Sequence, residues 1–168
     1  MPGPMNDNAH IIHDVGHGPV VERFLEDIAV GEVQEAGPLT VTAEEIISFA
    51  TRYDPLPMHI SDAGGLATVH EGLIGSGVLT IALKQRLIMS IERNSEIIGA
   101  ARIDDLNFLR PVRAGDELSM RQVCTANRES KSRPDRGLVT LEYEIFNQNG
   151  ENVLTSRDTI MMRRRPAA

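Results

Sequence analysis

The sequence predicts an α+β protein in which an antiparallel sheet packs over one long helix. The longest stretch with apolar residues at spacings of three and four begins at Ser76, and that spacing is typical of an amphipathic helix. Four β-rich segments then follow one another, separated by turn-forming residues. With 168 residues, the chain is long enough to bury a core around the helix without disulfide bonds or metal ions.

One strand and a shorter helix are expected before the long helix. The folded part begins near Phe24, and a strand covers about 33–41 after a glycine turn. Thr42 is followed three residues later by Glu45, which is the Thr-x-x-Glu pattern of a helix capping box. This helix should run to about Arg52, because two prolines close behind it prevent its continuation.

A stretch rich in proline and glycine connects the two helices. It starts with Asp-Pro-Leu-Pro-Met-His at 54–59. Asp54 and His59 are five positions apart, with two prolines stiffening the backbone between them. In a turn, the carboxylate and the imidazole can converge on one small volume and do acid/base work. Ser61 and Asp62 can then cap one short helical turn, which the following Gly-Gly pair would limit.

The long helix is expected from Ser76 to about 93–94. Its apolar positions are Leu79, Leu83, Leu87, Ile88 and Ile91, and the polar residues Lys84, Gln85 and Arg86 lie between them. A glycine-rich approach ends at Gly77. Backbone N–H groups at a helix start lack intrahelical partners and carry partial positive charge, so they can polarise a carbonyl oxygen.

The remainder of the chain predicts strands. They are expected at 97–108, 117–127, 137–146 and 153–162. The pair Asn149-Gly150 favours a tight hairpin turn. Apolar and polar residues alternate over 138–145, which indicates that one face of that strand is buried.

Composition excludes several classes of partner. The net charge of −7 and the absence of tryptophan argue against nucleic acid and against an anionic membrane. No apolar run is long enough to span a bilayer, and the N-terminus lacks a signal-peptide pattern, so we expect a cytoplasmic protein. The single cysteine, Cys124, is expected to be a small apolar residue of a strand.

The domain organisation is expected to be simple. We predict a flexible N-terminal arm at 1–22, a single folded domain at 23–165 and a short tail at 166–168. Three histidines in the arm have spacings that could face a metal ion: His10, His13 and His17. Because that segment is aperiodic and contains no cysteine, disorder is favoured and no metal site is expected.

At this point the chain resembles a known family, the MaoC-like hydratases and dehydratases of the hotdog fold. The resemblance covers about Phe24 to Met162. It rests on five motifs that occur in the family's order, at 24–31, 40–50, 54–59, 72–77 and 108–116. It implies a hotdog fold, in which the sheet wraps around the central helix.

The resemblance also implies an activity. Members of the family add water to a trans-2-enoyl thioester with (R) specificity, usually on coenzyme A, or catalyse the reverse dehydration. Asp54 and His59 match the acidic and histidine positions of the D-x-N-P-x-H motif, which hold and activate one water. Gly77 matches the glycine whose N–H binds the thioester oxygen, and Ser76 is assigned to the same substrate-binding region. No metal or organic cofactor is implied, since coenzyme A is part of the substrate.

The resemblance further implies at least a homodimer, or a dimer of dimers, with the acyl tunnel at the interface. The sequence departs from the family pattern at three positions. Leu56 replaces the usual asparagine, Tyr53 the common glycine, and Ser76 a frequent histidine. Losing the asparagine removes a local hydrogen bond that could stabilise the turn.

Other interpretations stay open from the sequence. The chain could be a non-catalytic subunit that binds acyl thioesters, or a thioesterase, for which Glu92 near the end of the helix is a poor candidate carboxylate. His70-Glu71 is a rival acid/base pair. Arg110 and Arg113 could contact phosphate groups, or could be exposed charges beside a proline turn.

Overall fold

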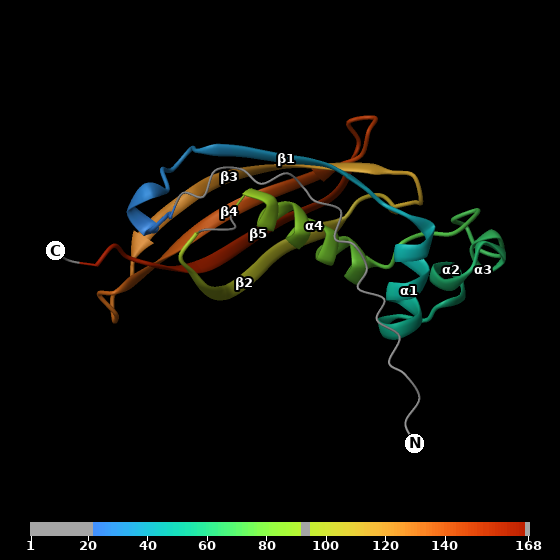
Figure 1. The fold of residues 1–168 in the computed structure, drawn as a ribbon, viewed down its shortest axis with the longest axis horizontal. Helices are drawn as coiled ribbons and strands as arrows, with labels where there is room; N and C mark the ends of the chain where they lie inside the picture. The colour runs from blue at the N-terminus through green and yellow to red at the C-terminus, as the bar shows by residue number, and fades with distance from the viewer. Residues whose placement is uncertain (1–21, 92–94, 167–168) are drawn as a thin grey trace, which may run out of the picture.

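The sheet of this protein wraps around one long helix. The computed structural model describes residues 22–91 and 95–166. Five antiparallel strands lie in the order β1-β3-β4-β5-β2 (Figure 1). Their bounds are Val33–Thr40 for β1, Ile97–Phe108 for β2, Glu117–Glu129 for β3, Arg136–Phe146 for β4 and Asn152–Arg163 for β5. The long helix α4, Gly77–Ile91, packs against this sheet, most closely against β1. The predicted α+β class is therefore confirmed.

The strands lie where the alternation of apolar residues places them. In β4, one face is buried, with Val139, Leu141, Tyr143 and Ile145 each at most 3% exposed. The turn between β4 and β5 contains Gly150 at φ +74°. Its N–H donates to the Asn147 carbonyl at 2.9 Å, so the glycine supplies the left-handed conformation that closes this hairpin.

Helix α4 buries more than its apolar residues. Its buried positions are Leu79, Thr80, Leu83, Lys84, Leu87 and Ile88. The apolar members agree with the predicted core face. Lys84, which the sequence places among the polar residues between them, is only 1% exposed and points into the core.

Three short helices gather at one end of the sheet, and the C-terminus and the 3-10 turn η1, Leu25–Asp27, lie at the other end (Figure 1). The first of them, α1, spans Ala43–Tyr53, and its N-cap Thr42 accepts the Glu45 N–H at 3.1 Å. This is the Thr42 half of the predicted capping box, while the Glu45 carboxylate accepts a bond from Arg86 Nη1 at 2.7 Å.

The two remaining helices are α2, Pro57–Ile60, and α3, Asp62–Leu66. Pro57 occupies the first helical position of α2, where its missing N–H costs nothing. Ser61 caps α3, as expected, and the helix is short, as predicted: it ends at Leu66, one residue after the two glycines. A side chain at Gly65 would overlap the Gly72 carbonyl, so this glycine allows close approach of the following loop.

Several predictions fall on residues outside the described part of the chain. These predictions concern the arm with its three histidines, of which only Glu22 is described, and the tail, of which only Pro166 is described. They also concern Glu92 and the predicted helix end at 93–94. The division into arm, domain and tail stays a prediction. None of the helices described is both long and apolar enough to cross a membrane.

Candidate active site

Asp54 and His59 lie on a tight backbone turn between α1 and α2. The Asp54 N–H donates to the Ala50 carbonyl at 2.8 Å and so ends α1. The Asp54 carbonyl accepts the Leu56 N–H at 2.8 Å, and the Leu56 carbonyl accepts the His59 N–H at 2.9 Å. These backbone bonds close the turn without an asparagine side chain. The departure at Leu56 therefore leaves the turn intact.

The turn brings the two predicted acid/base side chains together. His59 Nε2 lies 3.8 Å from Asp54 Oδ2. The His59 side chain is 6% exposed and that of Asp54 is 29% exposed, so the carboxylate faces solvent while the imidazole is enclosed. The separation is too long for a direct hydrogen bond. At this separation, one water could bond to both atoms at about 2.8 Å.

The other nitrogen of His59 fixes the ring. His59 Nδ1 lies 2.9 Å from the Ile74 carbonyl oxygen. A carbonyl oxygen only accepts hydrogen bonds, so Nδ1 carries the hydrogen. In the neutral imidazole, the lone pair is then on Nε2, the atom that faces Asp54. Backbone geometry thus presents a proton acceptor to the space between the two side chains.

The Ile74 segment joins this pair to the start of α4. The Ile74 N–H donates to the Met58 carbonyl at 3.1 Å, and the Gly75 N–H donates to the Val112 carbonyl at 2.8 Å. Gly77, the first residue of α4, follows Ile74 by three positions, so their Cα atoms are at most about 11 Å apart. The predicted donor and the predicted acid/base pair are therefore held by one short, hydrogen-bonded segment.

Ser76 and Gly77 play different structural roles at the start of α4. Ser76 is 0% exposed, and its hydroxyl accepts the Leu79 N–H at 3.1 Å, so it caps α4. No acceptor for the Gly77 N–H lies among the residues the structure describes. A Cβ at Gly77 would be 3.1 Å from the Phe108 ring, which places this aromatic side chain, 53% exposed, directly beside the glycine. Gly77 thus lies at the helix start beside an exposed aromatic ring, and Ser76 supports that start from within the core.

The rival acid/base pair, His70-Glu71, and the two candidate phosphate-binding arginines do not form a comparable site. The His70 carbonyl accepts a bond from Arg113 Nη2 at 2.6 Å. No hydrogen bond or ion pair joins the His70 and Glu71 side chains in the described ranges. Arg110 lies 3.4 Å from Glu151 and donates to the Asn152 carbonyl at 3.1 Å. Both arginines thus have structural partners in this chain.

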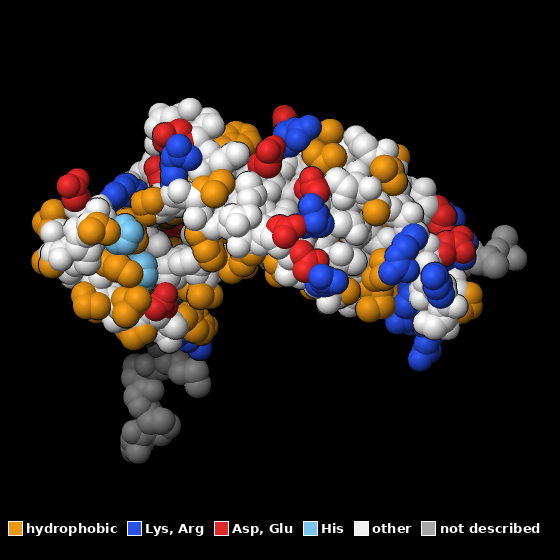
Figure 2. All heavy atoms as spheres, turned by 180° about the vertical axis from the view of Figure 1, so that it is seen from behind, with side chains coloured by type: hydrophobic (Ala, Val, Ile, Leu, Met, Phe, Trp, Pro, Cys, Tyr) orange, Lys and Arg blue, Asp and Glu red, His pale blue; other side chains and the backbone are white. Residues whose placement is uncertain are grey.

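The helical end of the molecule exposes many apolar side chains. Figure 2 shows histidine atoms beside a hollow at the helical end, surrounded by hydrophobic side chains. Exposed apolar residues of this end include Tyr53, Leu56, Leu66 and Val69. Among residues 22–91 and 95–166, no three histidine, cysteine or acidic side chains are grouped as a metal site requires.

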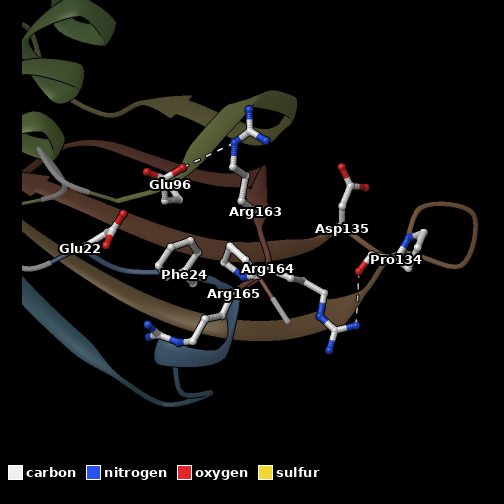
Figure 3. A pocket seen from close by; sticks show the side chains of 9 residues that line it. Glu22, Phe24, Glu96, Pro134, Asp135, Arg163, Arg164 and Arg165 are labelled. Atoms are coloured by element: carbon white, nitrogen blue, oxygen red, sulfur yellow. Dashed lines mark hydrogen bonds and ion pairs between the residues drawn. The ribbon is translucent and has the colours of Figure 1, made fainter. Parts of the chain in front are cut away.

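A cavity of about 640 Å³ lies at the opposite end, near the C-terminus (Figure 3). Phe24, Glu96 and three consecutive arginines line it. Each arginine already has an acidic partner: Arg163 with Glu96, Arg164 with Glu26 and Arg165 with Asp27. The cluster therefore fastens the C-terminal segment to the sheet and to η1, and it offers no unpaired positive charge to an anion.

Comparison with known proteins agrees with this architecture. The MaoC-like dehydratase of Rhodospirillum rubrum is 37% identical, the match covering 86% of this chain and 99% of that chain, with a TM-score of 0.79. The (R)-hydratase of A. caviae involved in PHA biosynthesis is 26% identical, over 84% of this chain and 99% of that chain, with a TM-score of 0.68. A mesaconyl-CoA hydratase of Haloarcula marismortui is 42% identical over 67 residues, which are 39% of this chain and 19% of that protein.

These similarities define the class as hotdog-fold hydratases and dehydratases. Residues 27–144 match the family described as MaoC like domain. The chain belongs to this family, and the predicted membership and hotdog fold are confirmed.

The sequence could not reveal two contacts of the site. The Ile74 carbonyl that orients His59 carries no side-chain signal, because any residue supplies a carbonyl. The ring of Phe108 comes from the end of β2, distant in sequence from Gly77, and the motif at 108–116 does not by itself place that ring beside the glycine.

Proposed function

We propose that this protein is a hydro-lyase that adds water to a 2-enoyl-CoA thioester, or removes it from the (R)-3-hydroxyacyl-CoA. The observation that carries the proposal is the placement of Asp54 Oδ2 and His59 Nε2 at 3.8 Å, a spacing suited to one shared water. The A. caviae relative is an (R)-hydratase and the Haloarcula relative a mesaconyl-CoA hydratase, which supports this class of reaction.

Hydration starts at the shared water. Its oxygen adds to C3 of the enoyl group while one of its protons passes to His59 Nε2. Asp54 accepts a hydrogen bond from the same water and stabilises the imidazolium by its negative charge. The electron pair of the C2–C3 double bond moves onto the thioester oxygen and forms an enolate.

The enolate oxygen is received at the start of α4. The Gly77 N–H, with the partial positive charge of the helix N-terminus behind it, donates to this oxygen as negative charge develops. The enolate then takes a proton at C2 from the His59 imidazolium, which restores the neutral ring. The net change is one water added, and no metal or organic cofactor is needed in this scheme.

The same site disfavours a thioesterase. A hydrolase on this fold would use a carboxylate on the central helix, and the described helix, Gly77–Ile91, contains no aspartate or glutamate. A non-catalytic subunit that binds thioesters would not need an enclosed histidine with a fixed tautomer beside a carboxylate.

The test is the loss of conjugated-thioester absorbance when the protein is mixed with crotonyl-CoA. We expect turnover in the wild type and its loss in His59→Ala. His70→Ala is the matched control and should keep wild-type turnover, because the His70 side chain is not part of the pair. If thioesters bind but none of several enoyl-CoAs is hydrated, the chain is a binding subunit and the proposal is wrong.

The assembly we propose is a homodimer. Strand β2 is a sheet edge, paired only with β5 within the described chain. It exposes Ile98, Ile103 and Phe108, and an open edge with apolar side chains is suited to pairing with a second copy. Analytical ultracentrifugation should show a dimer or a multiple of it. A monomer at micromolar concentration would refute this assembly.

A further inference from the structure

A buried cluster of charged and polar groups lies beneath α4, away from the Asp54–His59 pair. Lys84 of α4 is 1% exposed. Its Nζ donates to Asp158 Oδ2 at 2.6 Å and to Ser156 Oγ at 3.0 Å, both on β5. It also lies 5.0 Å from the centre of the Tyr143 ring on β4. Ser156 Oγ in turn donates to Asp158 Oδ1 at 2.8 Å.

The three polar groups are joined by hydrogen bonds to one another. Each carboxylate oxygen of Asp158 accepts a bond, and the Ser156 hydroxyl accepts one and donates one. Asp158 and Ser156 are themselves 7% and 5% exposed. The cluster therefore attaches the middle of α4 to β5 by short directional bonds inside the core.

Stability alone does not account for this cluster. Two charges lose much of their hydration on burial, and a well-packed apolar pair of similar volume is commonly as stable or more stable. What an apolar pair lacks is direction. Burial of the other residues of α4, such as Leu79, Leu83 and Leu87, gives a stabilisation that does not depend on the direction of any single contact. The ion pair is sensitive to sliding and to rotation of the helix on the sheet.

The position of α4 on the sheet determines where its first residue, Gly77, places its N–H group. Gly77 precedes Lys84 by seven positions on the same helix, which is two turns or about 10 Å along the axis. Over that length a helix moves as a rigid body. Any shift of α4 on the sheet therefore moves the Gly77 N–H by a similar amount. An error of about 1 Å in the placement of a catalytic group can reduce a rate about 100-fold.

We propose that Lys84 is a positioning residue. Its ion pair with Asp158 sets the register of α4 on the sheet and so places the Gly77 N–H where the thioester oxygen gains charge. This role rests on the proposed hydratase function. Lys84 does not contact the substrate in this proposal. It affects the transition state only through the position of α4.

The test is the double variant Lys84→Met/Asp158→Asn, which removes both charges and leaves no unpaired ion in the core. We expect it to remain folded, with kcat for crotonyl-CoA reduced about tenfold or more and KM changed less than about threefold, because the Gly77 bond strengthens in the transition state. The Gly77 amide signal in a ¹⁵N correlation spectrum should also move. Lys131→Met, at an exposed lysine between β3 and β4, is the matched control and should change neither.

A second variant covers the case in which the double variant does not fold. Lys84→Arg keeps the positive charge but lengthens the attachment to Asp158, so it should also shift the Gly77 signal and lower kcat. A Gly77 signal that stays at its wild-type position, or a wild-type kcat, in a folded variant overturns the proposal. If the wild type hydrates no enoyl-CoA, the proposed function fails separately, and the Gly77 signal still decides whether Lys84 sets the helix position.

Discussion

Replacing Asp54 with asparagine removes the charge beside His59 and almost nothing else. The side chain keeps its size, and the backbone bonds that close the turn come from main-chain groups. The Asp54 side chain is 29% exposed, so an uncharged amide at this position leaves no buried polar atom without water. We therefore expect Asp54→Asn to fold with the stability of the wild type.

The size of the effect follows from the geometry. At the observed 3.8 Å, a carboxylate and an imidazolium attract each other by about 4 kcal/mol if the effective dielectric constant is about 20. Because Asp54 is partly exposed, solvent screens this attraction, and half of it, about 2 kcal/mol, is a lower estimate. Each 1.36 kcal/mol of lost transition-state stabilisation lowers the rate tenfold, so a loss of about 2 to about 4 kcal/mol should lower kcat by about 30-fold to about 1,000-fold.

The assay is the loss of crotonyl-CoA absorbance over a range of substrate concentrations, with circular dichroism to confirm folding. KM should change little, because Asp54 contacts the water and not the thioester. If folded Asp54→Asn keeps more than about one tenth of the wild-type kcat, the shared-water arrangement is wrong, since the smallest loss expected from the charge is about 30-fold.

Three further predictions concern other parts of the chain. Gly77→Ala places a methyl group 3.1 Å from the Phe108 ring, so the ring must shift beside the proposed donor. Turnover should fall while the melting temperature stays near that of the wild type, and equal turnover would remove Gly77 from the site. Cys124 is 2% exposed and burial raises the pKa of its thiol, so Ellman's reagent should react with it only after unfolding in urea; rapid reaction of the native protein would contradict this burial. The Phe24 N–H, and then Arg165, lower the pKa of Asp27 below its usual 3.8. A carboxylate whose pKa is lower in the folded than in the unfolded protein stabilises the folded state at pH values above its unfolded-state pKa. This stabilisation is lost as the pH falls through the folded-state pKa. Asp27→Asn should therefore lower the melting temperature at pH 7 but not near pH 2, and a difference that persists in acid would refute a stabilising role of the Asp27 negative charge.

Local signals in the sequence were sufficient for most of the fold. The cap at Thr42 and the alternation in β4 depend on neighbouring residues, and both lie where the sequence predicted them. The turn at 54–59 was also accessible, because prolines restrict the backbone whatever the tertiary context. Its outcome, the approach of Asp54 and His59, follows from that restricted backbone.

Contacts between distant segments could not be predicted in the same way. Lys84 lies between apolar residues of a helix, where a polar side chain is ordinarily expected at the surface. Its burial depends on Asp158, 74 positions further along the chain. The tautomer of His59 depends on the Ile74 carbonyl, which no residue type reveals. In both cases the deciding partner is supplied by the tertiary fold.

The central claim is that Asp54 and His59 act on one water, and a double-mutant cycle tests it most directly. The kcat for crotonyl-CoA would be measured for the wild type, Asp54→Asn, His59→Gln and the double variant. If the two side chains share a water, the double variant should lose little more activity than the more damaged single variant, because residues that act as a unit have non-additive effects. Losses that multiply would show that the two side chains act independently and would contradict this account.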